Sequence, residues 1–116
     1  MKNYTDLGQS KKLLEFLPFE SADAYWDLQQ GGYILITCKL GYYINDSEVP
    51  CWSLAALFDV LPNKLQIVLA INDFQGDRKE KYVIGSVEND KYDCYADNPV
   101  DACYEMILRL YDQNLL

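Results

Sequence analysis

The chain has 116 residues and a formal net charge of −8, from 18 acidic and 10 basic side chains, and it contains no histidine. This length accommodates one hydrophobic core, and 50% of the residues are hydrophobic, so we expect a single domain over residues 1–116. The acidic balance argues against direct binding to nucleic acid, because phosphate contacts need a basic surface. No apolar stretch approaches the roughly 20 residues that span a bilayer, and no signal peptide is recognisable, so we expect a cytoplasmic protein.

The N-terminal segment is predicted to form two short helices. The first is expected over residues 8–16, and Pro18 ends it because proline cannot continue a helix. The second is expected to begin at Ser21, whose hydroxyl can cap a helix, and to end at Gly31-Gly32.

The middle of the chain alternates between strand and helix patterns. Residues 33–44 read as a strand whose even positions, from Ile34 to Ile44, are all apolar or aromatic and are expected to face the core. A polar turn is expected at residues 45–48. A helix then follows, with Ser53 as its N-cap and Pro62 as its end.

The C-terminal half is predicted to contain three strands and a long helix. Residues 65–71 form an apolar run of strand length, and residues 82–87 and 91–95 read as a hairpin. The last helix is expected from Asn98, the N-cap, to about Gln113, with Pro99 at the favoured first position and Asp101 completing a partial capping box. Its apolar residues recur every three or four positions, which predicts a helix that packs on a sheet through Val100, Cys103, Tyr104, Ile107, Leu108 and Tyr111.

These elements together predict an α+β fold. We expect a three- to four-stranded antiparallel sheet packed against three to four helices, in the order α-α-β-α-β-β-β-α.

The four cysteines, Cys38, Cys51, Cys94 and Cys103, are widely spaced and form no C-x-x-C pair. We interpret them as small buried hydrophobic residues, with a metal site or disulfides as the alternatives.

The chemistry needed for catalysis is largely missing. Without histidine the commonest general base is absent, and the sequence has no phosphate-binding glycine motif. The nearest carboxylate pairs, Asp90 with Asp93 and Asp97 with Asp101, are better explained as turn and cap residues. We therefore predict no catalytic residues, no cofactor and no metal, and a protein that is not an enzyme.

Tyrosine is unusually frequent, with 10 residues. Most lie on predicted strands, where sheet packing explains them, but those that point outward would form an amphipathic binding face. The acidic residues nearby are explained by solubility or by contact with a basic partner. The candidate interaction surface consists of Tyr33, Tyr43, Tyr92, Tyr95, Asp90 and Asp93.

Four segments of the sequence, taken in order, are similar to segments of a known family. They are Q-S-K-K-L-L-E-F (9–16), S-A-D-A-Y-W (21–26), W-S-L-A-A-L-F-D-V-L-P (52–62) and D-N-P-V-D-A-C-Y-E-M-I (97–107). Together they resemble a family of small uncharacterised phage, prophage and mobile-element proteins of Bacteroides-type gut bacteria. The resemblance implies a mobile-element origin and an accessory role, and it brings no catalytic residue or cofactor.

Two functions remain open from the sequence. The first is a non-enzymatic accessory or interaction protein of phage or prophage origin, whose partner is a protein. The alternative is an acidic nucleic-acid mimic that inhibits a host DNA-binding or defence protein. No oligomeric state is predicted.

Overall fold

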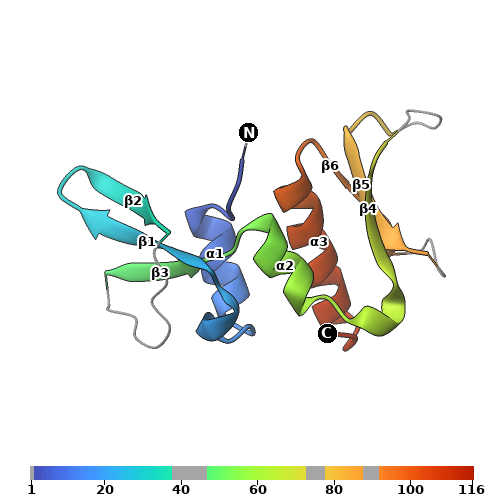
Figure 1. Ribbon diagram of the computed structural model, residues 1–116, viewed down its shortest axis with the longest axis horizontal. Helices are drawn as coiled ribbons and strands as arrows, with labels where there is room; N and C mark the ends of the chain where they lie inside the picture. Colours follow the sequence, from blue (N-terminus) through green and yellow to red (C-terminus); the bar gives the residue numbers. More distant parts are fainter. Residues whose placement is uncertain (1, 38–46, 73–77, 88–91) are drawn as a thin grey trace. The chain divides into compact units, whose positions relative to one another are not determined.

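The computed structural model describes residues 2–37, 47–72, 78–87 and 92–116 (Figure 1). They belong to two compact units, an N-terminal unit of Asn3–Asp59 and a C-terminal unit of Val60–Leu116 with Met1–Lys2. The described residues contain three α-helices and two three-stranded antiparallel sheets. The predicted α+β class is therefore confirmed, but the strands form two sheets where the sequence predicted one.

The N-terminal unit is built around the sheet β2-β1-β3, in which β1 is central. Both neighbours of β1 run antiparallel to it. The elements in chain order are α1 (Leu7–Leu14), the short 3₁₀ helix η1 (Phe19–Ser21), β1 (Ala24–Gln29), β2 (Gly32–Ile36), β3 (Glu48–Cys51) and α2 (Leu54–Val60), which reaches the boundary of the unit.

Helices α1 and α2 are confirmed, and each begins at a side-chain cap. Asp6 and Gln9 form a reciprocal capping box at the start of α1, which the sequence interpretation missed. Ser53 caps α2 as predicted, because its Oγ accepts a hydrogen bond from the Ala56 N–H at 3.2 Å. The Asp23 carboxylate in turn accepts bonds from the Ser53 N–H and hydroxyl.

The predicted second helix is wrong, because its residues form β1. Helix propensity is a weak preference that tertiary pairing overrides, and here β1 pairs along its length with β2 and over four residues with β3. Gln29 lies opposite Gly32, so the loop between the strands is only two residues long. Gly32 has a φ of 116°, which favours glycine at this turn.

The predicted strand and turn at residues 33–48 also need correction. The strand is observed as β2, which ends at Ile36, and residues 38–46 lie outside the described residues. Glu48, placed in a polar turn by the sequence, begins strand β3. β3 contains Pro50, which is tolerated because β3 is an edge strand.

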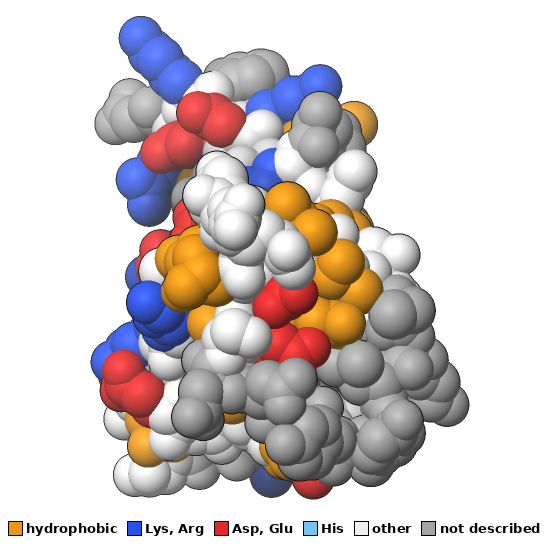
Figure 2. Space-filling model, turned by 90° about the vertical axis from the view of Figure 1, so that its left-hand side faces the viewer, with side chains coloured by type: hydrophobic (Ala, Val, Ile, Leu, Met, Phe, Trp, Pro, Cys, Tyr) orange, Lys and Arg blue, Asp and Glu red, His pale blue; other side chains and the backbone are white. Residues whose placement is uncertain are grey.

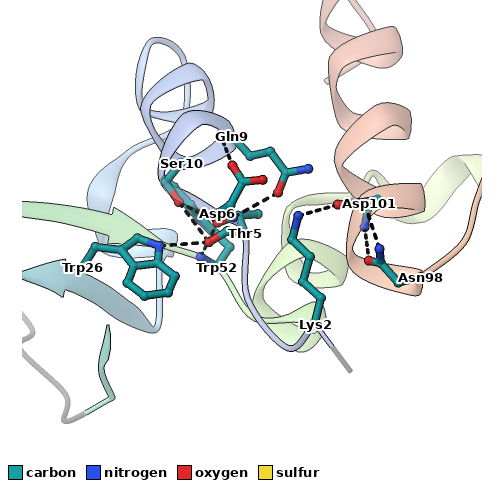
Figure 3. A network of polar contacts seen from close by, with 9 residues as sticks. All are labelled: Lys2, Thr5, Asp6, Gln9, Ser10, Trp26, Trp52, Asn98 and Asp101. Atoms are coloured by element: carbon teal, nitrogen blue, oxygen red, sulfur yellow. Dashed lines mark hydrogen bonds and ion pairs between the residues drawn. The ribbon is translucent and has the colours of Figure 1, made fainter. Parts of the chain in front are cut away.

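A small polar network lies in the core of the N-terminal unit (Figure 3). Thr5 and Ser10 are fully buried, and their hydroxyls are 2.8 Å apart. The Thr5 hydroxyl accepts a bond from the Trp52 N–H at 3.1 Å, and the Thr5 N–H donates to the Trp52 carbonyl at 2.9 Å. The Trp26 indole N–H donates to the Thr5 carbonyl at 3.0 Å. This network ties the segment before α1 to β1 and to the end of β3.

The C-terminal unit contains the second sheet, in the order β4-β5-β6, with helix α3 packed on β5 and β6. Its elements are the 3₁₀ helix η2 (Asn63–Leu65), β4 (Ile67–Ile71), β5 (Tyr82–Ser86), β6 (Cys94–Ala96) and α3 (Pro99–Asp112). The predicted strands of this half are confirmed, although β6 begins three residues later than expected.

Helix α3 begins as the sequence predicts. Asn98 Oδ1 accepts a bond from the Asp101 N–H at 2.9 Å, and Pro99 occupies the first turn. The Asp101 carboxylate accepts further bonds from the Asn98 amide and from the Lys2 ammonium, both at 2.7 Å (Figure 3). Asn98 is thus the cap, as predicted, while the Asp101 carboxylate bonds to the Asn98 side chain and not to its backbone N–H, so the predicted capping box is not formed.

Replacing Asn98 by alanine is expected to lower the free energy of unfolding by about 1 kcal/mol, because the Asp101 N–H loses its acceptor. Asn98→Ser retains a side-chain acceptor, so it is expected to lower the free energy of unfolding by less than Asn98→Ala does. Urea denaturation of both variants followed by circular dichroism tests this, and equal losses would contradict a capping role.

Candidate interaction surface

The β1–β2 hairpin exposes three large apolar side chains. Leu28 is 51% exposed, Tyr33 38% and Ile34 46%. We call these three residues the hairpin surface. Solvent exposure of several large apolar groups on one hairpin is typical of a surface that meets another molecule.

The strand register divides the hairpin surface between the two faces of the sheet. Leu28 and Tyr33 lie directly opposite one another and share a face. Ile34 lies opposite Asp27 and points to the other face. Asp27 is also opposite Glu48 on β3, so Asp27 lies between Ile34 and Glu48 on this face. Figure 2 shows a face of the molecule on which apolar side chains are exposed beside acidic ones.

The Asp27 carboxylate is held in place by its neighbours. It accepts hydrogen bonds from the Gln29 amide at 2.6 Å and from the Ser47 hydroxyl at 3.2 Å. These bonds orient a negative group next to Ile34 on this face of the hairpin.

The structure places the predicted surface residues in different parts of the chain. Tyr33 is exposed, as predicted, while Tyr43 and Asp90 lie outside the described residues. Tyr92, Asp93 and Tyr95 are close in sequence within the C-terminal unit, and all three are only partly exposed.

Tyr95 and Asp93 have local partners in the C-terminal unit. The Arg78 guanidinium lies over the Tyr95 ring, 4.7 Å from its centre. The Asp93 carboxylate lies so close to Gly85 that a Cβ atom there would be 2.0 Å from Asp93 Oδ1. These contacts favour a packing role for both side chains.

Two residues of the hairpin surface were missed by the sequence interpretation. Ile34 was assigned to the core face of its strand, yet nearly half of it is exposed. Leu28 fell inside the predicted second helix. A signal was present, since residues 33–36 are apolar at every position, which is typical of a strand with apolar side chains on both faces.

The described surface includes an open hollow of about 470 Å³ along α3, lined by Glu105, Leu108, Arg109, Asp112 and Gln113. Glu105 and Asp112 are exposed, and the Arg109 guanidinium donates to the Asp93 carbonyl at 3.0 Å. Both carboxylates face solvent, so the hollow is an open surface feature and not an enclosed pocket.

The three described cysteines are free thiols and buried. Burial raises the pKa of Cys51 to about 12, with a smaller contribution from Asp23, and burial likewise raises the pKa of Cys103 to about 12. Burial also raises the pKa of Cys94. A thiol that stays protonated is a poor nucleophile and metal ligand.

Among the described residues, no group of three or more Cys, Asp or Glu side chains is arranged to hold a metal ion. None of the described helices has both the length and the apolar character that a membrane span requires.

Comparison with known protein families, curated proteins and solved structures finds no match. The functional interpretation therefore depends on the chain's own residues.

Proposed function

We propose that this chain is a non-enzymatic accessory protein of phage or mobile-element origin that acts by binding another protein. The observation that carries the proposal is the hairpin surface, where Leu28 and Tyr33 are exposed on one face of a short hairpin and Ile34 on the other. Burying such side chains against a partner supplies binding energy at about 25 cal/mol per Å² of apolar surface.

The neighbouring charges favour a particular kind of partner. Asp27 lies opposite Ile34 on one side and opposite Glu48 on the other. A partner with an apolar patch bordered by lysine or arginine would match this arrangement, because a basic group would attract the Asp27 carboxylate next to Ile34.

The alternative of a nucleic-acid mimic has less support. A mimic needs carboxylates that are free to imitate phosphates, but several carboxylates here have structural partners. Asp6 caps α1, Asp23 accepts bonds from Ser53, and the Asp101 carboxylate accepts a bond from the Asn98 amide and pairs with Lys2.

The proposal predicts that Leu28→Lys or Ile34→Lys weakens partner binding at least tenfold, because a charged side chain enters an apolar contact. The test is affinity capture from the native host, with mass spectrometry to identify the partner and titration to measure its affinity. Val87→Lys is the matched control, since Val87 is 65% exposed and lies outside the hairpin.

Circular dichroism and thermal melting confirm that each variant remains folded. Unchanged affinity in both hairpin variants would contradict the proposed surface. Capture only of DNA-binding proteins, released by salt and insensitive to either substitution, would instead favour the nucleic-acid mimic.

A further inference from the structure

Strand β4 is an apolar edge strand with little cover. It consists of Ile67, Val68, Leu69, Ala70 and Ile71, and none of the five is buried. It lies at one edge of the sheet, and α3 packs on the other two strands. Ile71 is 68% exposed and Val68 49%. An apolar strand in this position invites pairing with a further strand.

The hydrogen bonds at the two ends of β4 establish which backbone groups face outward. The Asn72 N–H donates to the Lys81 carbonyl at 2.7 Å, and the Val87 N–H donates to the Gln66 carbonyl at 3.2 Å. In an antiparallel pair, hydrogen-bonded positions alternate with non-bonded ones. Residues 66, 68, 70 and 72 therefore bond to β5.

The backbone N–H and C=O groups of Ile67, Leu69 and Ile71 consequently point away from the sheet. Over the described parts of the chain, no strand pairs with this edge of β4. β4 also contains no charged residue and no proline, which natural edge strands use to prevent pairing.

We propose that β4 pairs antiparallel with β4 of a second copy of this chain, around a two-fold axis at Leu69. In this register Leu69 faces Leu69 of the second copy, and Ile67 faces Ile71. All three outward-facing residues then occupy hydrogen-bonded positions, and each such pair forms two N–H···O bonds. The result is one six-stranded sheet shared by two copies.

A second copy suits this edge because it brings apolar residues opposite apolar residues at each paired position, Leu69 with Leu69 and Ile67 with Ile71. The outward groups are symmetric about Leu69, so the same residues satisfy one another across the axis. The strand has no charge, so pairing brings no like charges directly opposite each other. The net charge of −8 on each copy still opposes association at long range, and salt screens this repulsion.

The inference is tested with the purified full-length chain by sedimentation velocity from 1 µM to 1 mM at 50 and 500 mM NaCl. We expect a monomer–dimer equilibrium that is stronger at high salt. Ile71→Lys is expected to weaken dimerisation at least tenfold, because it places a charge on the paired edge. Leu14→Lys, which changes an exposed leucine on α1, is expected to leave dimerisation unchanged.

Amide hydrogen exchange by NMR tests the register itself. The amides of Val68 and Ala70 should be protected at all concentrations, since they bond to β5. The amides of Ile67, Leu69 and Ile71 should become protected only at concentrations where the dimer forms. A monomer throughout, a dimer unaffected by Ile71→Lys, or a dimer with these three amides unprotected would overturn the proposal. None of these readouts involves the proposed protein partner, so the two proposals fail independently.

Discussion

Replacing Trp52 by alanine is expected to lower the free energy of unfolding by about 3–5 kcal/mol, as large-to-small substitutions of buried aromatic residues do. Trp52 is completely buried. Its indole N–H donates to the Ser21 hydroxyl at 3.0 Å, and its backbone is bonded twice to Thr5. Alanine retains the backbone bonds, so the loss measures the packing of the ring and the one indole bond.

Trp26→Ala is the matched control. Trp26 also donates one indole hydrogen bond, to the Thr5 carbonyl, but it is only partly buried. Trp26→Ala is therefore expected to lower the free energy of unfolding clearly less than Trp52→Ala does. Thermal and urea denaturation followed by circular dichroism compare the two, and a Trp52→Ala loss below about 1 kcal/mol would contradict a central role for this residue in the core.

The capped helices could be predicted because their signals are local. Asn98, Pro99 and Asp101 lie within four residues, and the bonds they form are those expected of a helix start. The same holds for Ser53 at the start of α2. The buried face of α3 was predicted less well, because Met106 and Leu110 are fully buried while Tyr111 is exposed.

Strands β1 and β3 could not be predicted because their structure depends on pairing between distant segments. Ala24 pairs with Cys51, and Trp26 with Val49. Nothing within residues 21–31 alone indicates this partner, and a serine followed by alanines suits a helix cap equally well.

Only one residue of the candidate surface could be predicted from the sequence. Tyr33 could be chosen because tyrosine on a strand is a frequent interface residue, and it is exposed. Leu28 could not, because its exposure follows from the β1–β2 pairing. Ile34 was misplaced because alternation was assumed to leave one polar face, whereas both faces of β2 are apolar.

The buried thiols are expected to make the protein lose stability above pH 9. Burial raises the pKa values of Cys51 and Cys103 from 9.0 to about 12. Below pH 9 both thiols are protonated in the folded and the unfolded chain, so their full contribution to stability is present. Between pH 9 and 12 the unfolded chain loses protons that the folded chain retains, so the free energy of unfolding falls as the pH rises.

The expected magnitude is about 2 kcal/mol per thiol at pH 10.5, since each pH unit within this range contributes about 1.36 kcal/mol. Urea denaturation between pH 8 and 10.5 measures the decline. Cys51→Ala and Cys103→Ala have lower stability at pH 8, because each leaves a small cavity, but their decline with pH should be shallower by about this amount. A decline as steep as that of the unaltered protein would show that these thiols ionise as readily in the folded chain as in the unfolded one. The comparison between slopes isolates the cysteines, because all other side chains are common to the three proteins.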